Sequence, residues 1–217
     1  MNSSKKSILN SNFTYLAAFV LPVIMMMALY YTRGIFPWGN ECYLRSDMYH
    51  QYAPFFSELW HKIRNGESLT YSWNIGMGTN FTSLFAYYLA SPSNWFVALF
   101  PQKYTIEIMN AFIILKIAGS SLSLTYYLTK HNNNKHVIAA IFGMFYGMSG
   151  FIAAYSWNIM WLDCVILIPL IMLGLERLVN ENRCIFYCIT LGLCIFTNYY
   201  IAIMVCPVSY THLRAHE

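Results

Sequence analysis

The carboxylate best placed for chemistry is Asp47, which follows the first apolar segment of the chain after a short connection. The pattern from Met48 to Trp60 is amphipathic and predicts a helix lying on a membrane surface, with Asp47 near its N-cap. Gln51 falls one turn later on the same side of that helix. A carboxylate in a cleft at the membrane surface can act as a general base, and the alternative is that Asp47 only caps the helix.

A second polar cluster, at 71–80, combines an aromatic ring, two amides and two glycines. Trp73 offers a flat face of the kind on which sugars stack, with Asn74 beside it and Asn80 at the end of the cluster. Gly76 and Gly78 permit a close approach of the backbone to a ligand. The cluster predicts a substrate-binding surface, and the alternative is an ordinary turn.

A third set of candidates lies in the turn at 157–163, where Asn158 and Trp161 precede another carboxylate, Asp163. This turn is expected at the outer edge of a span, on the same side as Asp47. Ionisable residues at membrane depth are costly and often mark functional sites. The alternative is an interfacial helix cap flanked by tryptophans of the aromatic belt.

Lys116 lies near the middle of the apolar stretch 106–128. An ammonium group there must reach the interface, pair with a carboxylate or face a polar cavity. It can neutralise a lipid phosphate or hold a structural partner, and the sequence leaves both roles open.

The composition places all these residues in a membrane protein. Of the 217 residues, 58% are hydrophobic, 18% are aromatic and only 10% are charged, where a soluble domain carries about 25% charged residues. So few charges exclude a soluble enzyme and a disordered chain, and the absence of a long basic run excludes a nucleic-acid partner. The expected fold is an all-α, polytopic transmembrane helix bundle.

About five spans are expected, with a long outer loop at about 33–104 that carries interfacial helices. The stretch 81–100 is apolar but broken by Ser91-Pro92-Ser93-Asn94, and we expect it not to cross, because the short basic connections then all face the cytoplasm together with Lys5 and Lys6. This arrangement places the N-terminus in the cytoplasm of a cell-membrane protein. The expected spans are Phe13–Tyr31, Ile106–Leu128, Val137–Tyr155, Trp161–Leu178 and Cys184–Cys206.

The end of the chain, 207–217, departs abruptly from the apolar pattern of the preceding spans. We expect these residues to be a non-native tail. Residues 1–206 would then form the N-terminal part of a larger transmembrane domain.

The order of three motifs after the first span resembles the YfhO family of bacterial multi-pass membrane proteins. These motifs are Asp-x3-Gln-Tyr-x-Pro-Phe at Asp47–Phe55, Trp-Asn-x-Gly-x-Gly-x-Asn-Phe at Trp73–Phe81 and Tyr-Tyr-Leu-x-Ser-Pro at Tyr87–Pro92. The turn from Asn158 to Asp163 and the run Thr197–Tyr200 also resemble that family. The resemblance covers about 12–206 and implies that family members extend well beyond this chain.

The resemblance implies a GT-C-like fold and a membrane glycosyltransferase, which transfers a sugar from a polyprenyl-phosphate carrier to a cell-envelope polymer such as lipoteichoic acid at the outer membrane face. It implies that Asp47 deprotonates the acceptor hydroxyl, or positions the acceptor or a metal ion, and that Asp163 is the second catalytic carboxylate. A further set of residues would bind the substrates. These are Gln51, Tyr52, Trp73, Asn74, Gly76, Gly78, Asn80, Lys116, Asn158 and Trp161.

Residue spacing predicts no metal site, and a divalent cation remains a candidate cofactor only as a means of stabilising the leaving phosphate. The expected partners are the lipid-linked sugar, the envelope polymer and membrane lipid. A transporter or flippase for a lipid-linked envelope precursor is the alternative function, and it would be expected to show interrupted helices in paired repeats. A non-catalytic assembly subunit is a third reading, for which Gly143-x3-Gly147 offers a small-residue helix face.

Overall fold

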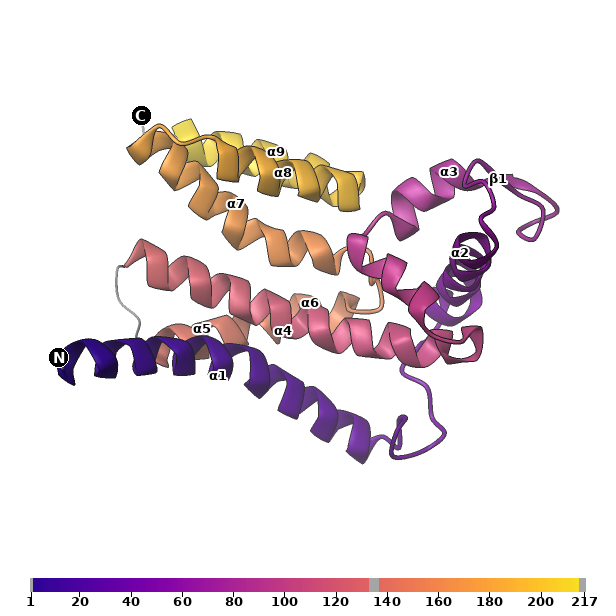
Figure 1. Cartoon of the computed structure of the whole chain (residues 1–217), viewed down its shortest axis with the longest axis horizontal. Helices are drawn as coiled ribbons and strands as arrows, with labels where there is room; N and C mark the ends of the chain where they lie inside the picture. The colour runs from indigo at the N-terminus through magenta and orange to yellow at the C-terminus, as the bar shows by residue number, and fades with distance from the viewer. Residues whose placement is uncertain (1, 133–136, 215–217) are drawn as a thin grey trace.

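The protein is described by a computed structural model that covers residues 2–132 and 137–214, and nearly all of its elements are helices (Figure 1). Residues 133–136, in the basic connection between the predicted spans Ile106–Leu128 and Val137–Tyr155, and residues 215–217 of the predicted tail lie outside the described residues. The helices that form the body of the molecule are α1 (Asn2–Thr32), α4 (Thr105–His131), α5 (Val137–Gly147), α6 (Gly150–Tyr155), α7 (Leu162–Glu181), α8 (Ile185–Thr197) and α9 (Tyr199–Arg214).

Three stretches of the described residues are long and apolar enough to cross a membrane: Asn12–Thr32, Gln102–His131 and Val137–Tyr155. Two shorter apolar helices follow at Ile185–Thr197 and Tyr199–Thr211. A helix of about 20 apolar residues spans the hydrocarbon core, because each residue adds about 1.5 Å. The prediction of an all-α, polytopic membrane bundle is therefore confirmed.

Helix α4 forms the centre of the bundle and packs against α1, α5 and α7. In its apolar window 72% of the residues are buried inside the protein, against 28% for α1 and 22% for α5. A transmembrane helix that packs on several sides can carry polar side chains toward its neighbours, since it does not face lipid. Accordingly, its serines and threonines at 120, 121, 123, 125 and 129 are all buried.

Helices α4 and α5 approach closely because small residues line their contact. A Cβ atom at Gly147 would lie 2.8 Å from the carbonyl oxygen of Ile117 and 3.0 Å from Cβ of Ser121. The Thr125 hydroxyl also donates a hydrogen bond across the contact to the carbonyl of Ala139, at 3.2 Å. The Gly143-x3-Gly147 face therefore serves packing within the chain.

Replacing Gly147 with alanine should separate these two helices. Overpacking of a close helix contact costs about 1–3 kcal/mol, so we expect Gly147→Ala to lower the thermal midpoint of the detergent-purified protein. Gly192→Ala is the matched control, because an added Cβ at Gly192 in α8 meets no atom within 4 Å. Equal midpoints for Gly147→Ala and the wild type would contradict the close contact.

The last predicted span, Cys184–Cys206, is divided into two helices by a break at Asn198. Asn198 has extended backbone angles, φ −160° and ψ 102°, and its side-chain oxygen accepts a hydrogen bond from the Ile201 amide at 3.0 Å, in the manner of an N-cap. Helix α9 then runs back beside α8 (Figure 1). The single span was wrong because an N-cap residue inside an apolar run starts a new helix.

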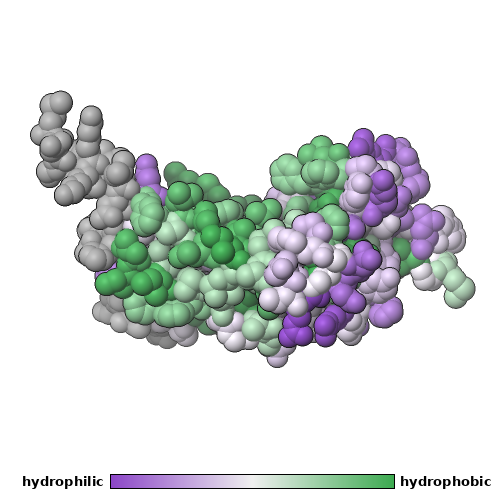
Figure 2. Space-filling model, turned by 90° about the horizontal axis from the view of Figure 1, so that it is seen from below, coloured by the Kyte–Doolittle hydropathy of each residue, from purple (hydrophilic) through white to green (hydrophobic). Residues whose placement is uncertain are grey.

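The segment 33–104 gathers at one end of the bundle and does not cross it (Figure 1). Its stretch 81–100 forms only short helical turns, as expected from the Ser-Pro break. Figure 2 shows hydrophobic side chains over the helical body and hydrophilic ones gathered at this end. The elements of the segment are η1 (Met48–Tyr52), α2 (Ala53–Asn65), β1 (Tyr71–Ser72), β2 (Thr79–Asn80), α3 (Phe81–Leu84), η2 (Phe85–Leu89), η3 (Pro92–Leu99) and η4 (Gln102–Tyr104).

The opposite end of the bundle holds the start of α1, the end of α4 and the α7–α8 connection (Figure 1). Lys130 and Arg183 therefore lie at the same end as the N-terminus, and the positive-inside rule predicts that this end faces the cytoplasm. The orientation in the membrane stays a prediction.

Labelling of single cysteines tests this orientation. In a variant whose six native cysteines are replaced by alanine, we expect Asn65→Cys to react with an impermeant maleimide added to intact cells. Glu181→Cys, at the other end of the bundle, should react only after the membrane is opened. The reverse pattern would place segment 33–104 in the cytoplasm and contradict the predicted topology.

Helix α9 continues through Pro207 to Arg214, so the change of composition at 207 does not coincide with the end of a helix. The assignment of 207–217 as a non-native tail stays a prediction.

Candidate functional site

Asp47 lies directly before η1 and leaves its carboxylate exposed. Its backbone is helical, and its side chain makes no capping hydrogen bond. Its only described side-chain contact is a long one, 3.5 Å from Oγ of Ser46 to Oδ1. The capping alternative is therefore excluded by the geometry, and the carboxylate is available to a ligand.

Tyr52 connects this helix to the turn between α6 and α7. Its hydroxyl donates a hydrogen bond to Oδ1 of Asn158 at 3.1 Å, and its ring stacks on Trp157 with centroids 6.4 Å apart. Gln51 donates a hydrogen bond of 3.3 Å to the Tyr88 hydroxyl, and the Tyr88 ring lies 5.3 Å from that of Tyr52. Three segments that are far apart in the sequence, η1, η2 and the α6–α7 turn, thus meet close to Asp47 in the chain.

Burial raises the pKa of Tyr52 well above that of a free tyrosine, and the nearby phenol of Tyr88 and the charge of Asp47 add to the shift. The pKa of Tyr88 is raised for the same first reason. Both phenols therefore remain protonated donors at physiological pH.

Asp163 and Lys116 form a buried ion pair between α7 and α4. Oδ2 of Asp163 lies 2.6 Å from Nζ of Lys116, and their side chains are 14% and 5% exposed. The ammonium also donates to the carbonyl of Ile159, at 3.2 Å, which lies in the turn before α7. Of the roles open to Lys116 from its sequence position, the geometry favours pairing with a carboxylate.

Two donors in the same turn are buried and unused. Nδ2 of Asn158 and Nε1 of Trp161 have no hydrogen-bond partner among the residues that the structure describes. The Trp161 ring stacks on Tyr200 of α9, with centroids 5.9 Å apart. Buried donors without partners are uncommon and are often satisfied by a ligand or water.

The cluster at 71–80 forms a hairpin apart from this turn. Asn74 donates a 3.0 Å hydrogen bond to Glu58 of α2, which also accepts from Ser72 at 2.6 Å. Lys62 completes the network, with Nζ 3.7 Å from the Glu58 carboxylate and 2.8 Å from the carbonyl of Tyr71. Asn74 therefore holds the hairpin to α2.

The remaining residues of the hairpin shape its turns. Gly76 and Gly78 have positive φ angles of 55° and 111°, so they allow the tight turn at its tip. Asn80 caps α3 by accepting a 3.3 Å hydrogen bond from the Ser83 amide. Trp73 is widely exposed, at 77%, as is Met77, at 95%, and Trp73 stays a candidate for contact with a ligand or the membrane.

A pocket of about 690 Å³ opens next to Asp47, between the end of α1, the chain at 33–46 and the end of α6. It is lined by Leu29, Arg33, Ile35, Glu41, Cys42, Tyr43, Arg45, Ser46, Ala153, Ser156 and Trp157.

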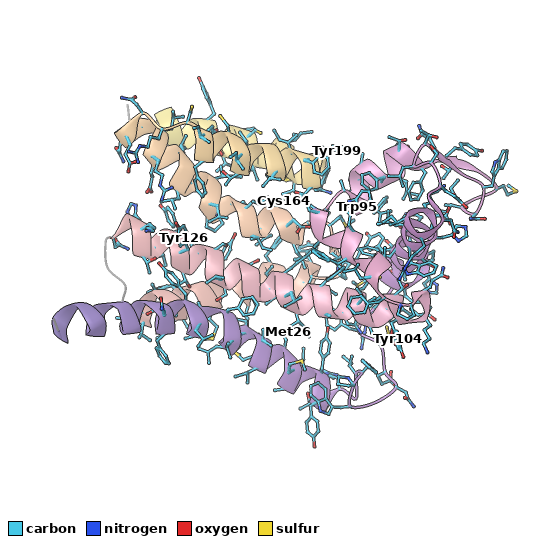
Figure 3. The ribbon with its side chains drawn as sticks, viewed as in Figure 1. Met26, Trp95, Tyr104, Tyr126, Cys164 and Tyr199 are labelled. Carbon is cyan, nitrogen blue, oxygen red and sulfur yellow. The ribbon has the colours of Figure 1, made fainter. Side chains whose placement is uncertain are left out.

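Sequence reasoning did not assign Tyr88, Trp157 or Asn198 to the site. Asn198 donates a 3.0 Å hydrogen bond to the carbonyl of Tyr87 and so ties the α8–α9 turn to this region. Figure 3 shows Tyr199, at the start of α9, on the side of the bundle that faces Trp95 of η3. The available signals in the sequence are that Trp157 lies in the predicted turn, that Tyr88 belongs to the motif Tyr87–Pro92 and that Asn198 is a polar residue inside an apolar run.

The described side chains include no group of three or more His, Cys, Asp and Glu residues that could hold a metal ion. Asp47 by itself does not supply the ligand set that a divalent cation needs.

The comparison with known families also identifies a membrane protein. The profile described as "Bacterial membrane protein YfhO" matches residues 17–213. The chain belongs to the YfhO family. The match confirms the resemblance to the YfhO family that the three sequence motifs indicated. The matched region also includes residues 207–213 of the predicted tail. No curated protein and no solved structure matches it.

The Lys116–Asp163 pair offers a direct test of the site's construction. We expect Lys116→Met and Asp163→Asn each to destabilise the protein by about 3–5 kcal/mol, because each leaves a buried charge without its partner. The double variant should lose less than the sum of the two. The control is Arg183→Gln, which removes an exposed pair of 3.3 Å and should change the thermal midpoint little. Additive losses would show that the two side chains do not interact.

Proposed function

We propose that this YfhO-family chain is part of a membrane glycosyltransferase. The enzyme would transfer a sugar from a polyprenyl-phosphate carrier to a cell-envelope polymer such as lipoteichoic acid, at the outer face of the cell membrane. The observation that carries the proposal is the exposed, uncapped carboxylate of Asp47, set between a pocket and a cluster of protonated phenols at the polar end of an apolar bundle.

In the proposed reaction Asp47 is the general base. The acceptor hydroxyl gives its proton to the Asp47 carboxylate while its oxygen forms a bond to the anomeric carbon of the sugar. The bond from that carbon to the phosphate oxygen breaks, and the lipid phosphate leaves with the electron pair as an anion. Base catalysis of this kind requires a carboxylate within hydrogen-bond reach of the hydroxyl, which an exposed side chain allows.

The second predicted catalytic residue, Asp163, is better suited to positioning. Its carboxylate is held by the ammonium of Lys116 at 2.6 Å, so it is not free to approach an acceptor hydroxyl. The pair instead fixes the turn that presents Asn158 and Trp161, whose unused donors suit the oxygen atoms of a sugar or phosphate. Within 2–132 and 137–214, no cluster of side chains offers a ligand set for a divalent cation.

Gln51 and Tyr52 support the same proposal from the other side of the cluster. Their side chains are held by Tyr88 and Asn158, so they present a fixed surface next to Asp47. A fixed polar surface orients a substrate at little entropic cost.

Transport of a lipid-linked envelope precursor is the second candidate. It is favoured by one interrupted helix, because α5 and α6 are separated at Met148 and Ser149 within the apolar stretch Val137–Tyr155. Interrupted helices are typical of transporter binding sites, where they occur in paired repeats. Transport needs no general base, so replacing Asp47 distinguishes the two functions.

The proposal predicts that Asp47→Asn in the complete gene lowers transfer of sugar to the envelope polymer by about 10²–10⁴-fold, the range expected for loss of a general base. Transfer is measured as polymer-bound sugar in cells with equal amounts of the protein in the membrane. The control is Glu67→Gln, which removes another carboxylate of segment 33–104, 43% exposed and outside the site.

Unchanged sugar content in Asp47→Asn cells would overturn the catalytic assignment. Unchanged sugar content together with slower return of the lipid carrier would favour the transport function.

A further inference from the structure

The pocket beside Asp47 contains two arginines that no described carboxylate neutralises. Arg33 follows the end of α1, and Arg45 lies two residues before Asp47. Neither guanidinium forms an ion pair or a side-chain hydrogen bond with the residues described here, although Glu41 lines the same pocket. Each guanidinium carries a fork of donors that matches the oxygen atoms of a phosphate, and two of them line this pocket.

The backbone that carries these arginines is held in place on both sides. The Ile35 amide donates to the carbonyl of Tyr30 at 2.9 Å, and the Glu41 amide donates to the carbonyl of Gly34 at 3.0 Å. Leu44 is 5% exposed and anchors the chain directly before Arg45. The two guanidinium groups are therefore attached to a fixed frame, which reduces the entropic cost of binding an anion.

Hydroxyl groups add to the polar side of the pocket. The hydroxyls of Tyr43 and Ser156 lie 2.7 Å apart and join segment 33–104 to the end of α6. Ser46 also lines the pocket, and its hydroxyl donates to Asp47. The lining of the pocket therefore includes the residue directly before the proposed base.

The other side of the pocket is apolar and comes from the membrane helices. Leu29 belongs to the apolar span of α1, and Ala153 belongs to α6 at the end of the apolar stretch Val137–Tyr155. Trp157 completes this wall. A pocket with cations on its polar side and aliphatic side chains at the end of two spans suits a molecule with a phosphate head and a hydrocarbon tail.

We infer that this pocket binds the phosphate of a membrane lipid ester, with Arg33 and Arg45 as its ligands. The inference deepens the proposed function and rests on it only for the sugar that the phosphate would carry. Glu41, on the same wall, can accept hydrogen bonds from the hydroxyls of such a sugar. The two arginines would then stabilise the leaving phosphate of the proposed reaction. Lys116 is less suited to this role, because its ammonium already pairs with Asp163.

Arg33 also follows the C-terminal end of α1, where a positive charge interacts favourably with the helix dipole. Replacing Arg33 therefore affects helix stability as well as the pocket. Arg45 is outside any such helix end and gives the sharper test. Arg64, on α2 in the same segment, contacts the ring of Trp60 and does not line the pocket. Arg64→Gln therefore removes an equal charge from the same end of the molecule and is the matched control.

The test is binding of a radiolabelled isoprenoid monophosphate to the full chain in nanodiscs of neutral phosphatidylcholine. We expect Arg45→Gln and Arg33→Gln each to weaken binding about tenfold or more, because each removes a charge-assisted hydrogen bond to the phosphate. Arg64→Gln should bind as the wild type does. Competition with inorganic phosphate and with phosphatidylglycerol distinguishes a free anion and a common lipid from the isoprenoid ester.

Wild-type binding by Arg45→Gln, or an equal loss in Arg64→Gln, would overturn the site. Displacement by inorganic phosphate at the same concentration as the isoprenoid ester would overturn the requirement for a lipid. Thermal midpoints of all variants separate loss of binding from loss of folding, and a Lys substitution at 45 should restore part of the affinity.

Asp47→Asn separates this inference from the proposed function. If that variant binds the isoprenoid phosphate normally but does not transfer sugar, both proposals stand. If it binds and transfers normally, the phosphate site stands and the catalytic role of Asp47 fails.

Discussion

The buried ion pair between Lys116 and Asp163 is the interaction on which the arrangement of the site depends. A single charge in the middle of a membrane bundle is strongly disfavoured, so each side chain needs the other. The pair joins the central helix α4 to the start of α7, and the additional bond from Lys116 to the Ile159 carbonyl fixes the turn between α6 and α7. That turn carries Asn158, whose side-chain oxygen accepts the hydrogen bond from the Tyr52 hydroxyl. The turn thus fixes the position of the helix that follows Asp47.

The chain separates two physical tasks between its two regions. The helical body supplies apolar surface to the membrane, and its central helix hides its polar side chains against neighbours. The segment 33–104 supplies the hydrophilic end of the molecule (Figure 2). The pocket with Arg33 and Arg45 lies at the boundary between these regions, and so does Asp47. A reaction between a lipid-borne donor and a water-borne acceptor needs such a boundary.

Some residues of the chain have structural roles that their sequence context does not reveal. Asn74 and Asn80 stand in a motif that suggests ligand binding, yet one holds the hairpin to Glu58 and the other caps α3. Asn198 lies in an apolar run that is long enough to span the membrane, yet it starts a new helix. An asparagine can satisfy either a ligand or the backbone, and only its neighbours in space decide which.

The sequence alone determined the membrane class, the positions of α1, α4 and α5–α6, the family and the exposed location of Asp47, because hydrophobic runs and loop motifs are local properties. It did not determine that Lys116 pairs with Asp163, that α8 and α9 form a hairpin, or that two arginines share a pocket with Ser156 and Trp157. Most of these features join residues that are far apart in the sequence. Lys116 and Asp163, for example, are 47 positions apart. Only the packing of the helices against one another decides such contacts, since no local preference of the chain encodes them.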